Sequence, residues 1–338
     1  MSKEKILNAK ISEESAINNL PPGIHIPRDI VSQEVLPVKN LDELIKKNAK
    51  LDKLAALELP TDIYNQLYQL SQESGENNLI YAAGDVRVLN ILPSTLTNMD
   101  YTLLNAIRSG IIELKSPPPS IDLRADWWDI SNQGNSGACV GFGVADGLLR
   151  YIFTKNKSLN PGERLASGIL WQAAKETDVF NDQATTFIAL EGTSVKAALN
   201  FAQTKGIVRE SVAPFGTLYT KDAATFYRLA AQLRLSGIYN LGKNFNNWKQ
   251  WLSTSGPIVA AINVDSSFQN ATAAKGKLDS YNLNQIYGGH CICFVGYTSD
   301  NRIIIRNSWG TDWGDKGYAY ASVDWIMKAC LEAYGAVI

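Results

Sequence analysis

Residues 131–153 read SNQGNSGACVGFGVADGLLRYIF, and this stretch decides the fold. A polar, glycine-rich loop leads directly into an apolar run. In that run Val144, Leu148 and Ile152 recur every four residues, which is the spacing of one face of a helix. Cys139 therefore lies where the loop becomes a helix. The first N–H groups of a helix lack partners and its dipole is positive there, so we expect a lowered pKa for the Cys139 thiol.

Gln133 lies in the loop six residues before Cys139. We expect its side-chain amide to point toward the Cys139 thiol. The residues that follow a known pattern are Gln133, Gly134, Gly137, Cys139 and Phe142. At these positions the segment resembles the papain-like cysteine peptidases. Val140 departs from the family, which usually has tryptophan after the cysteine. From this segment alone, Cys139 could instead be a buried structural cysteine. Segments elsewhere in the chain are needed to choose between a catalytic and a structural role.

Two distant segments extend the resemblance in the right order. His290 follows two glycines and lies 151 residues after Cys139, close to the family's usual spacing of about 130–150. Residues 306–318 read RNSWGTDWGDKGY, which resembles the family's Asn-Ser-Trp-Gly-x-x-Trp-Gly-x-x-Gly-Tyr segment at every fixed position. Asn307 heads this segment. The resemblance therefore covers residues 121 to about 321.

The resemblance implies a role for each of these side chains. Cys139 would be the nucleophile, and His290 as an imidazolium would stabilise its thiolate and then protonate the departing amine. Asn307 would orient the imidazole, and Trp309 would shield their hydrogen bond from water. The Gln133 amide and the Cys139 backbone N–H would form the oxyanion hole.

Substrate-binding residues are implied less directly. Gly192 and Thr193 fall where the family has a glycine pair that hydrogen-bonds the substrate backbone as an added strand. Only one of the two glycines is kept in this chain. Gly289 and Trp309, beside His290 and Asn307, complete the substrate-binding candidates.

Composition changes at residues 115–120, which read KSPPPS and predict a stiff, extended linker. All eight tryptophans and all four cysteines follow Asp126. We therefore expect an N-terminal extension at 1–118 and a papain-like peptidase domain at 119–338. Within the second part, patterning predicts helices at 168–176 and 195–203, and strands at 258–264, 291–297, 302–306 and 317–323. A helical half followed by a strand-rich half suits the family's two-lobed α+β fold, with the active site between the lobes.

The N-terminal extension is expected to be mainly helical. Its patterning predicts helices at 41–57, 60–70 and 99–112 and a strand at 86–92, while prolines require an extended chain at 20–27. The Glu-Arg-Phe-Asn-Ile-Asn signature of the family's best-known propeptides is not found. We expect the extension to be an intramolecular inhibitor that covers the cleft. A substrate-recruiting module and a merely stabilising extension are the alternatives.

Charge and composition indicate which classes of partner and cofactor the chain is expected to bind. Lysine and arginine total 32 against 33 acidic residues, so neither a nucleic acid nor a membrane is an expected partner. No cofactor is expected, because the chain lacks a phosphate-binding loop and a fourth ligand for a metal at Cys291 and Cys293 is not evident. Ser136 replaces a cysteine that forms a disulfide in secreted relatives. This fits a bacterial-type member without the usual disulfides and, with no signal peptide in this chain, a cytoplasmic location. Export without a cleaved signal is the alternative.

Together these segments predict a cysteine peptidase that acts on a peptide or protein substrate. An endopeptidase is the default, because the histidine pair of the family's dipeptide-trimming members has no counterpart near His290. Two alternatives stay open. An amine could replace water as the acyl acceptor, which would make the chain a transferase or ligase. The chain could also be an inactive binding protein that keeps the fold.

Overall fold

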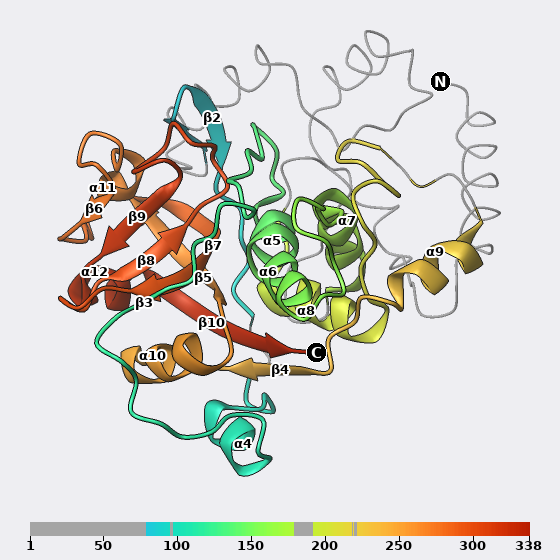
Figure 1. The fold of residues 1–338 in the computed structure, drawn as a ribbon. Coiled ribbons are helices and arrows are strands. Elements are labelled where there is room, and N and C mark those ends of the chain that lie inside the picture. The colour runs from blue at the N-terminus through green and yellow to red at the C-terminus, as the bar shows by residue number, and fades with distance from the viewer. Residues whose placement is uncertain (1–78, 95–96, 179–191, 218, 220–221) are drawn as a thin grey trace, which may run out of the picture.

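The computed structural model describes residues 79–338 except 95–96, 179–191, 218 and 220–221 (Figure 1). The helices expected at 41–57 and 60–70 and the extended stretch at 20–27 lie outside the described residues. Over 79–118 the chain forms the hairpin β1 (Leu79–Ala82) and β2 (Asp85–Val88), followed by α4 (Leu103–Arg108).

Both elements expected in this part are shorter than predicted. The strand predicted over 86–92 ends at Val88, because residues 89–92 leave the hairpin and pair elsewhere. The helix predicted over 99–112 begins only after Thr102, which forms a capping box with Asn105. It ends at Arg108, with Ser109 as its C-cap, and the next residue, Gly110, has a positive φ of 73°.

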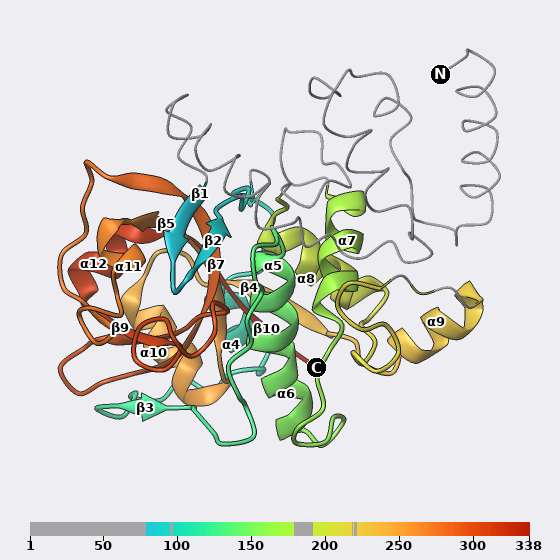
Figure 2. The same ribbon diagram turned by 90° about the horizontal axis from the view of Figure 1, so that it is seen from above.

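The rest of the chain forms a helical lobe and a strand-rich lobe, which the two views show side by side (Figures 1 and 2). Its helices are α5 (Cys139–Gly141), η2 (Phe142–Leu149), α6 (Arg150–Lys155), α7 (Ser167–Thr177), α8 (Val195–Thr204), α9 (Ala223–Ala230), α10 (Phe245–Thr254), α11 (Ser266–Gln269) and α12 (Val323–Ala329). Its strands are β3 (Ile121–Asp122), β4 (Gly237–Asn240), β5 (Ile258–Asp265), β6 (Lys277–Leu278), β7 (Ile286–Tyr297), β8 (Ile303–Arg306), β9 (Tyr318–Ala321) and β10 (Cys330–Val337). The sheet runs in the order β4-β10-β5-β7-β8-β9-β6, and β3 pairs with β7.

The elements predicted in this part are present. The helices predicted at 168–176 and 195–203 are α7 and α8, and the four predicted strands correspond to β5, β7, β8 and β9. No described helix has the length and apolar character needed to cross a membrane.

The helix that begins at Cys139 packs closely against β7. A Cβ atom on Gly143 would lie 2.4 Å from the sulfur of Cys291, and one on Gly147 would lie 2.5 Å from the sulfur of Cys293. Four helical residues rise about 6 Å and two strand residues about 6.6 Å, so the two glycine–cysteine pairs match in spacing. The cysteines considered as metal ligands therefore fill the space that the glycines leave. This seam fixes the distance between the two lobes.

Strand β7 separates two hydrophobic cores, because its side chains alternate between two faces. Cys291 and Cys293 face the helix that begins at Cys139. Ile292 and Phe294 face the core of the other lobe, which is rich in tryptophan. His290 shares the face of Ile292, and this places its ring among the aromatic side chains of the strand-rich lobe.

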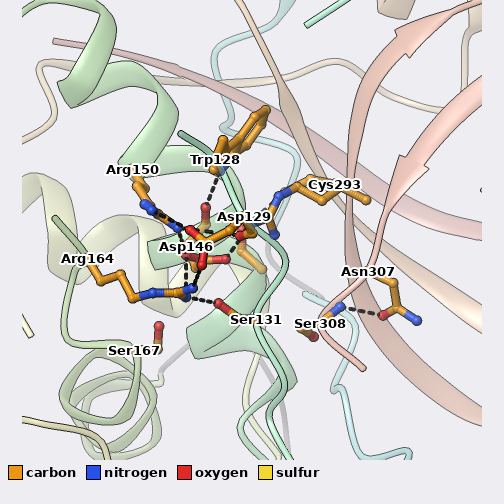
Figure 3. A network of polar contacts seen from close by, with 12 residues as sticks. Trp128, Asp129, Ser131, Asp146, Arg150, Arg164, Ser167, Cys293, Asn307 and Ser308 are labelled. Atoms are coloured by element: carbon orange, nitrogen blue, oxygen red, sulfur yellow. Dashed lines mark hydrogen bonds and ion pairs between the residues drawn. The ribbon is translucent and has the colours of Figure 1, made fainter. Parts of the chain in front are cut away.

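A buried ion cluster joins the two lobes behind this seam (Figure 3). Asp146 on η2 lies 3.0 Å from Nη1 of Arg150 and 2.7 Å from Nη2 of Arg306 on β8. Although burial alone would raise the pKa of Asp146, the cations of Arg306, Arg150 and Arg164 hold it below its ordinary value. Because Arg306 immediately precedes Asn307, the cluster ties the strand of Asn307 to the helix of Cys139.

Replacing Asp146 with asparagine is expected to lower the free energy of unfolding by about 3–5 kcal/mol, since it leaves buried guanidinium groups without their carboxylate. The free energy is measured by urea unfolding. A carboxyl with a lowered pKa stabilises the fold above about pH 4 and loses that effect as the pH falls through its folded value. The loss should therefore shrink below about pH 4. Asp122→Asn, at a partly exposed ion pair with Arg124, is the control and should cost less than about 1 kcal/mol. Equal losses in the two variants would contradict this reading of the cluster.

Candidate active site

Cys139 is the first residue of α5 and is fully buried. Its Sγ atom donates a hydrogen bond to Oδ1 of Asn90 at 3.6 Å. Burial raises the pKa of the thiol to about 12, against the opposing effect of the backbone N–H groups of Cys291, Val140 and Cys139. The lowered pKa predicted from the helix start is therefore wrong for this state, because desolvation outweighs the helix N-terminus. One of these N–H groups belongs to Cys291, the residue after His290, so the thiol lies next to the strand that carries His290.

His290 is fully buried on β7, and its Nε2 atom lies 2.8 Å from Oδ1 of Asn307. The same Oδ1 atom accepts the backbone N–H of Ser308 at 2.8 Å, which fixes it as the oxygen of the amide. Nε2 must therefore carry the proton, and Nδ1 is left as an unprotonated acceptor. Within the described residues Nδ1 has no hydrogen-bond partner. The predicted contact between His290 and Asn307 is present, and it leaves the other ring nitrogen ready to accept a proton.

The imidazolium predicted for His290 is absent from this state. Burial lowers the pKa of His290 to about 4, the bond to Asn307 opposes this shift, and the nearby cation of Arg87 adds to it. Near neutral pH the site thus holds a neutral thiol and a neutral imidazole. Trp309 packs on the imidazole with ring centroids 4.7 Å apart, which agrees with the shielding expected of it.

Gln133 lies in the same site and is held on both ends of its amide. Its Oε1 atom accepts the hydroxyl of Ser308 at 2.7 Å, and Nε2 donates to the carbonyl of Ser136 at 3.0 Å. An amide nitrogen carries two hydrogens, so a second N–H remains for an oxyanion. The loop of Cys139 and the segment of Asn307 therefore position this donor jointly.

Residues 87–92 of the extension contact all four substrate-binding candidates. The N–H of Ile91 donates to the carbonyl of Gly289 at 3.2 Å, and the N–H of Leu92 donates to the carbonyl of Thr193 at 3.2 Å. A Cβ on Gly192 would lie 1.5 Å from the carbonyl oxygen of Asn90, so only glycine permits this approach. Trp309 accepts a bond from Arg87 at 3.3 Å through its carbonyl.

The hairpin from which residues 89–92 continue lies at the junction of the two lobes, next to β7 and the start of the Cys139 helix (Figure 2). Beyond Leu92 the contact continues, since the Ser94 N–H and hydroxyl donate to the carboxylate of Glu332 at 3.3 Å. Burial raises the pKa of Glu332 to about 7. Sequence patterns missed Arg87, Asn90 and Glu332, because nothing in their local sequence indicates contacts with residues so distant in the chain.

Comparisons with known proteins identify the family of this chain. The sequence model of the papain family of cysteine proteases matches residues 117–332, more than half of the chain. Mouse cathepsin F is 26% identical over 220 residues, which cover 61% of this chain and 44% of that protein. Peptidase 1 of Euroglyphus maynei is 27% identical over 318 residues, 88% of this chain and 86% of that protein. This chain thus spans less than half of cathepsin F.

Solved structures show the same fold. Xylellain, a cysteine protease from Xylella fastidiosa, matches with a TM-score of 0.59 at 15% identity, over 74% of this chain and 95% of that one. Digestive procathepsin L 3 of Tenebrio molitor matches with a TM-score of 0.52 at 17% identity, over 90% of this chain and 100% of that one. The two-lobed α+β fold expected from the sequence is confirmed. The chain belongs to the papain family of cysteine proteases.

Proposed function

We propose that this chain hydrolyses internal peptide bonds with Cys139 as nucleophile, and that its N-terminal segment keeps it latent. The observation that carries the proposal is the path of residues 87–92. They pass Cys139 at Asn90 and use the carbonyls of Gly289 and Thr193 as an added strand would. The occupant of the cleft is thus a piece of polypeptide chain, the chemical class of the proposed substrate.

The proposed reaction uses the side chains of Cys139, His290 and Gln133. Nδ1 of His290 takes the thiol proton, and the sulfur of Cys139 attacks the substrate carbonyl carbon. The oxygen becomes an anion, which the second N–H of Gln133 and the backbone N–H of Cys139 stabilise. Each such donor typically contributes about 3–4 kcal/mol to lowering the barrier. The Nδ1 proton then passes to the departing amine as the C–N bond breaks, and His290 activates water to release the acyl group.

Asn307 acts on this sequence through the ring of His290. Its Oδ1 atom accepts a hydrogen bond from Nε2–H, so the tautomer that presents a free lone pair at Nδ1 is favoured. The same bond stabilises the imidazolium formed in the first step, because Nε2–H is a stronger donor when the ring is charged.

An endopeptidase is supported by the continuity of the bound segment. The chain enters the cleft at Arg87 and leaves it at Ser94, with polar contacts at both ends. A cleft that holds a chain passing through it is open on both sides of Cys139. Internal bonds of a substrate therefore fit it as well as terminal ones.

Latency is supported by the burial of Cys139 and His290 in the state in which residues 87–92 lie beside them. Cys139 and His290 are both fully buried, and the pKa of each is shifted toward its neutral form. Removing the segment admits water and removes the Arg87 cation from the vicinity of His290. Both changes favour the thiolate and the imidazolium.

The pH dependence of alkylation tests both parts of the proposal. With the chain intact, Cys139 should react with iodoacetamide at least ~100-fold slower than free cysteine at pH 7, and the rate should rise about tenfold per pH unit. The comparison uses a chain that is folded whole and then cut at a protease site inserted between Lys115 and Ser120, which we call the cut chain. Lys115 is 63% exposed, so the linker is accessible. In the cut chain the rate should be high and nearly constant between about pH 5 and 8, because the charged pair persists across that range.

Site-resolved mass spectrometry provides the control within the same molecule. Cys291, Cys293 and Cys330 are also buried and should stay unlabelled in both forms. A Cys139 rate that is equal in the two forms would overturn latency. A cut chain whose Cys139 rate still climbs tenfold per pH unit would overturn the ion-pair chemistry.

A further inference from the structure

Arg87 is a buried cation whose side chain is only 1% exposed. Its guanidinium donates to the carbonyl of Ala82 in the hairpin at 3.2 Å. Its three other acceptors belong to the lobes and not to the hairpin. They are Oδ1 of Asn132 at 2.9 Å, the carbonyl of Gly134 at 2.8 Å and the carbonyl of Trp309 at 3.3 Å. We call these three oxygens the guanidinium subsite.

The guanidinium subsite is held together by bonds that do not involve the hairpin. Oδ1 of Asn132 also accepts the N–H of Gly134 at 3.0 Å, in a local turn. Gly134 has a positive φ of 60°, which a side chain would disfavour. The N–H of Gly310 donates to Ser131 at 3.0 Å, and residues 132 and 309 form an antiparallel bridge. The subsite is therefore expected to keep its shape when the N-terminal segment leaves.

The chemistry of the guanidinium subsite suits one kind of side chain. Its three groups are all acceptors, and the carbon of the guanidinium lies 5.8 Å from the centre of the Trp309 ring, over which a cation is attracted. Arginine has five N–H donors spread over a planar fork, so it reaches diverging oxygens at once. Lysine presents a single nitrogen and cannot span them equally well.

The position of the subsite relative to Cys139 is fixed by the same segment. Arg87 lies three residues before Asn90, which contacts the sulfur, so the subsite is about 10 Å along an extended chain from that contact. It lies on the side opposite to Thr193, which binds Leu92. A substrate that replaces the segment brings one of its own side chains to this place.

We propose that the guanidinium subsite receives an arginine side chain of the substrate, so that the peptidase prefers peptides with arginine at one fixed position, about three residues from the residue that faces Cys139. The inference rests on the proposed function and names the substrate class of that same site. In the intact chain Arg87 occupies the place of this substrate arginine.

The test is cleavage of a peptide series by the cut chain. Arginine replaces norleucine at each position in turn of an otherwise constant octapeptide, and product masses locate the cut bond. At one position arginine should raise kcat/KM about tenfold or more over norleucine, which corresponds to about 1.4 kcal/mol. Lysine at that position should give a smaller gain. An arginine that has no effect at any position would overturn the inference.

Variants of Asn132 assign the preference to this subsite. Asn132→Leu removes one of the three acceptors and should reduce the arginine preference severalfold, while Asn132→Asp adds a charge and should increase it and admit lysine. Asn156→Leu is the matched control, because Oδ1 of Asn156 makes the same turn to the N–H of Ser158 at an exposed place. An arginine preference that neither Asn132 variant changes belongs to another pocket and contradicts the proposal. If Asn132→Leu does not fold, Asn132→Asp alone decides.

Failure of this inference is distinguishable from failure of the proposed function. If the cut chain cleaves no peptide and Cys139 is not labelled by a thiol-directed peptide electrophile, the peptidase assignment itself is wrong. If peptides are cleaved without a preference that depends on Asn132, only the guanidinium subsite is refuted.

Discussion

Cys139→Ala is expected to reduce hydrolysis of a peptide by the cut chain by at least about 10⁴-fold. In the proposed reaction the thiol forms the acyl intermediate, and alanine leaves His290 with no proton to accept. Binding should survive, because Gly289, Thr193 and the guanidinium subsite are untouched. The measurement is kcat/KM for a fluorogenic peptide, with the Kd of the same peptide measured separately on the variant.

A buried cysteine elsewhere provides the matched control. Cys330 is as buried as Cys139, and its sulfur lies 3.6 Å from the backbone carbonyl of Glu332. Cys330→Ala should leave kcat/KM unchanged and lower the free energy of unfolding by about 1 kcal/mol. A Cys139→Ala variant that still cleaves peptides at the original rate would end the peptidase assignment.

Arg87→Met is expected to activate the intact, uncut chain by about tenfold or more. Methionine fills much of the same volume but donates nothing, so the contact between the segment and the guanidinium subsite loses its hydrogen bonds. Bonds to a charged group contribute about 1.5–3 kcal/mol each, and losing even one raises the open fraction about tenfold. The variant also removes a cation that lowers the pKa of His290. The measurement is hydrolysis of a small peptide by intact chains, with a mass spectrum confirming that they are uncut.

Arg108→Met is the control for this variant. Arg108 is an exposed arginine of the same extension, at the end of α4. Its replacement should leave the activity of the intact chain unchanged. An Arg87→Met chain that is folded and as inactive as the original would show that other contacts, such as that of Asn90, suffice for latency. It would refute the role of Arg87 in holding the segment in the cleft.

The candidate site residues of the peptidase domain could be located from the sequence. Cys139, His290, Asn307 and Gln133 stand in short patterns whose glycines, tryptophans and helix start are themselves constraints of the backbone. The structure brings His290 to Asn307, as the resemblance implied, and it also brings Gln133 to Ser308. Their role in the reaction remains a proposal.

The state of the site was not predictable, because it depends on contacts between distant parts of the chain. A helix start favours a thiolate in water, yet Asn90 and its neighbours exclude water from Cys139 and reverse the expected shift of its pKa. Likewise, Val86–Leu92 alternates like a strand throughout, and nothing in that pattern shows that pairing passes from the hairpin to Gly289 and Thr193 at its end.

The close packing of Gly143 against Cys291 and the ion pair of Arg306 with Asp146 both hold the two lobes together. We therefore expect the separation of the lobes to stay the same when residues 87–92 leave. A rigid compound shaped from the backbone of residues 87–92 would match the vacated groove without adjustment, and its design can start from this closed form.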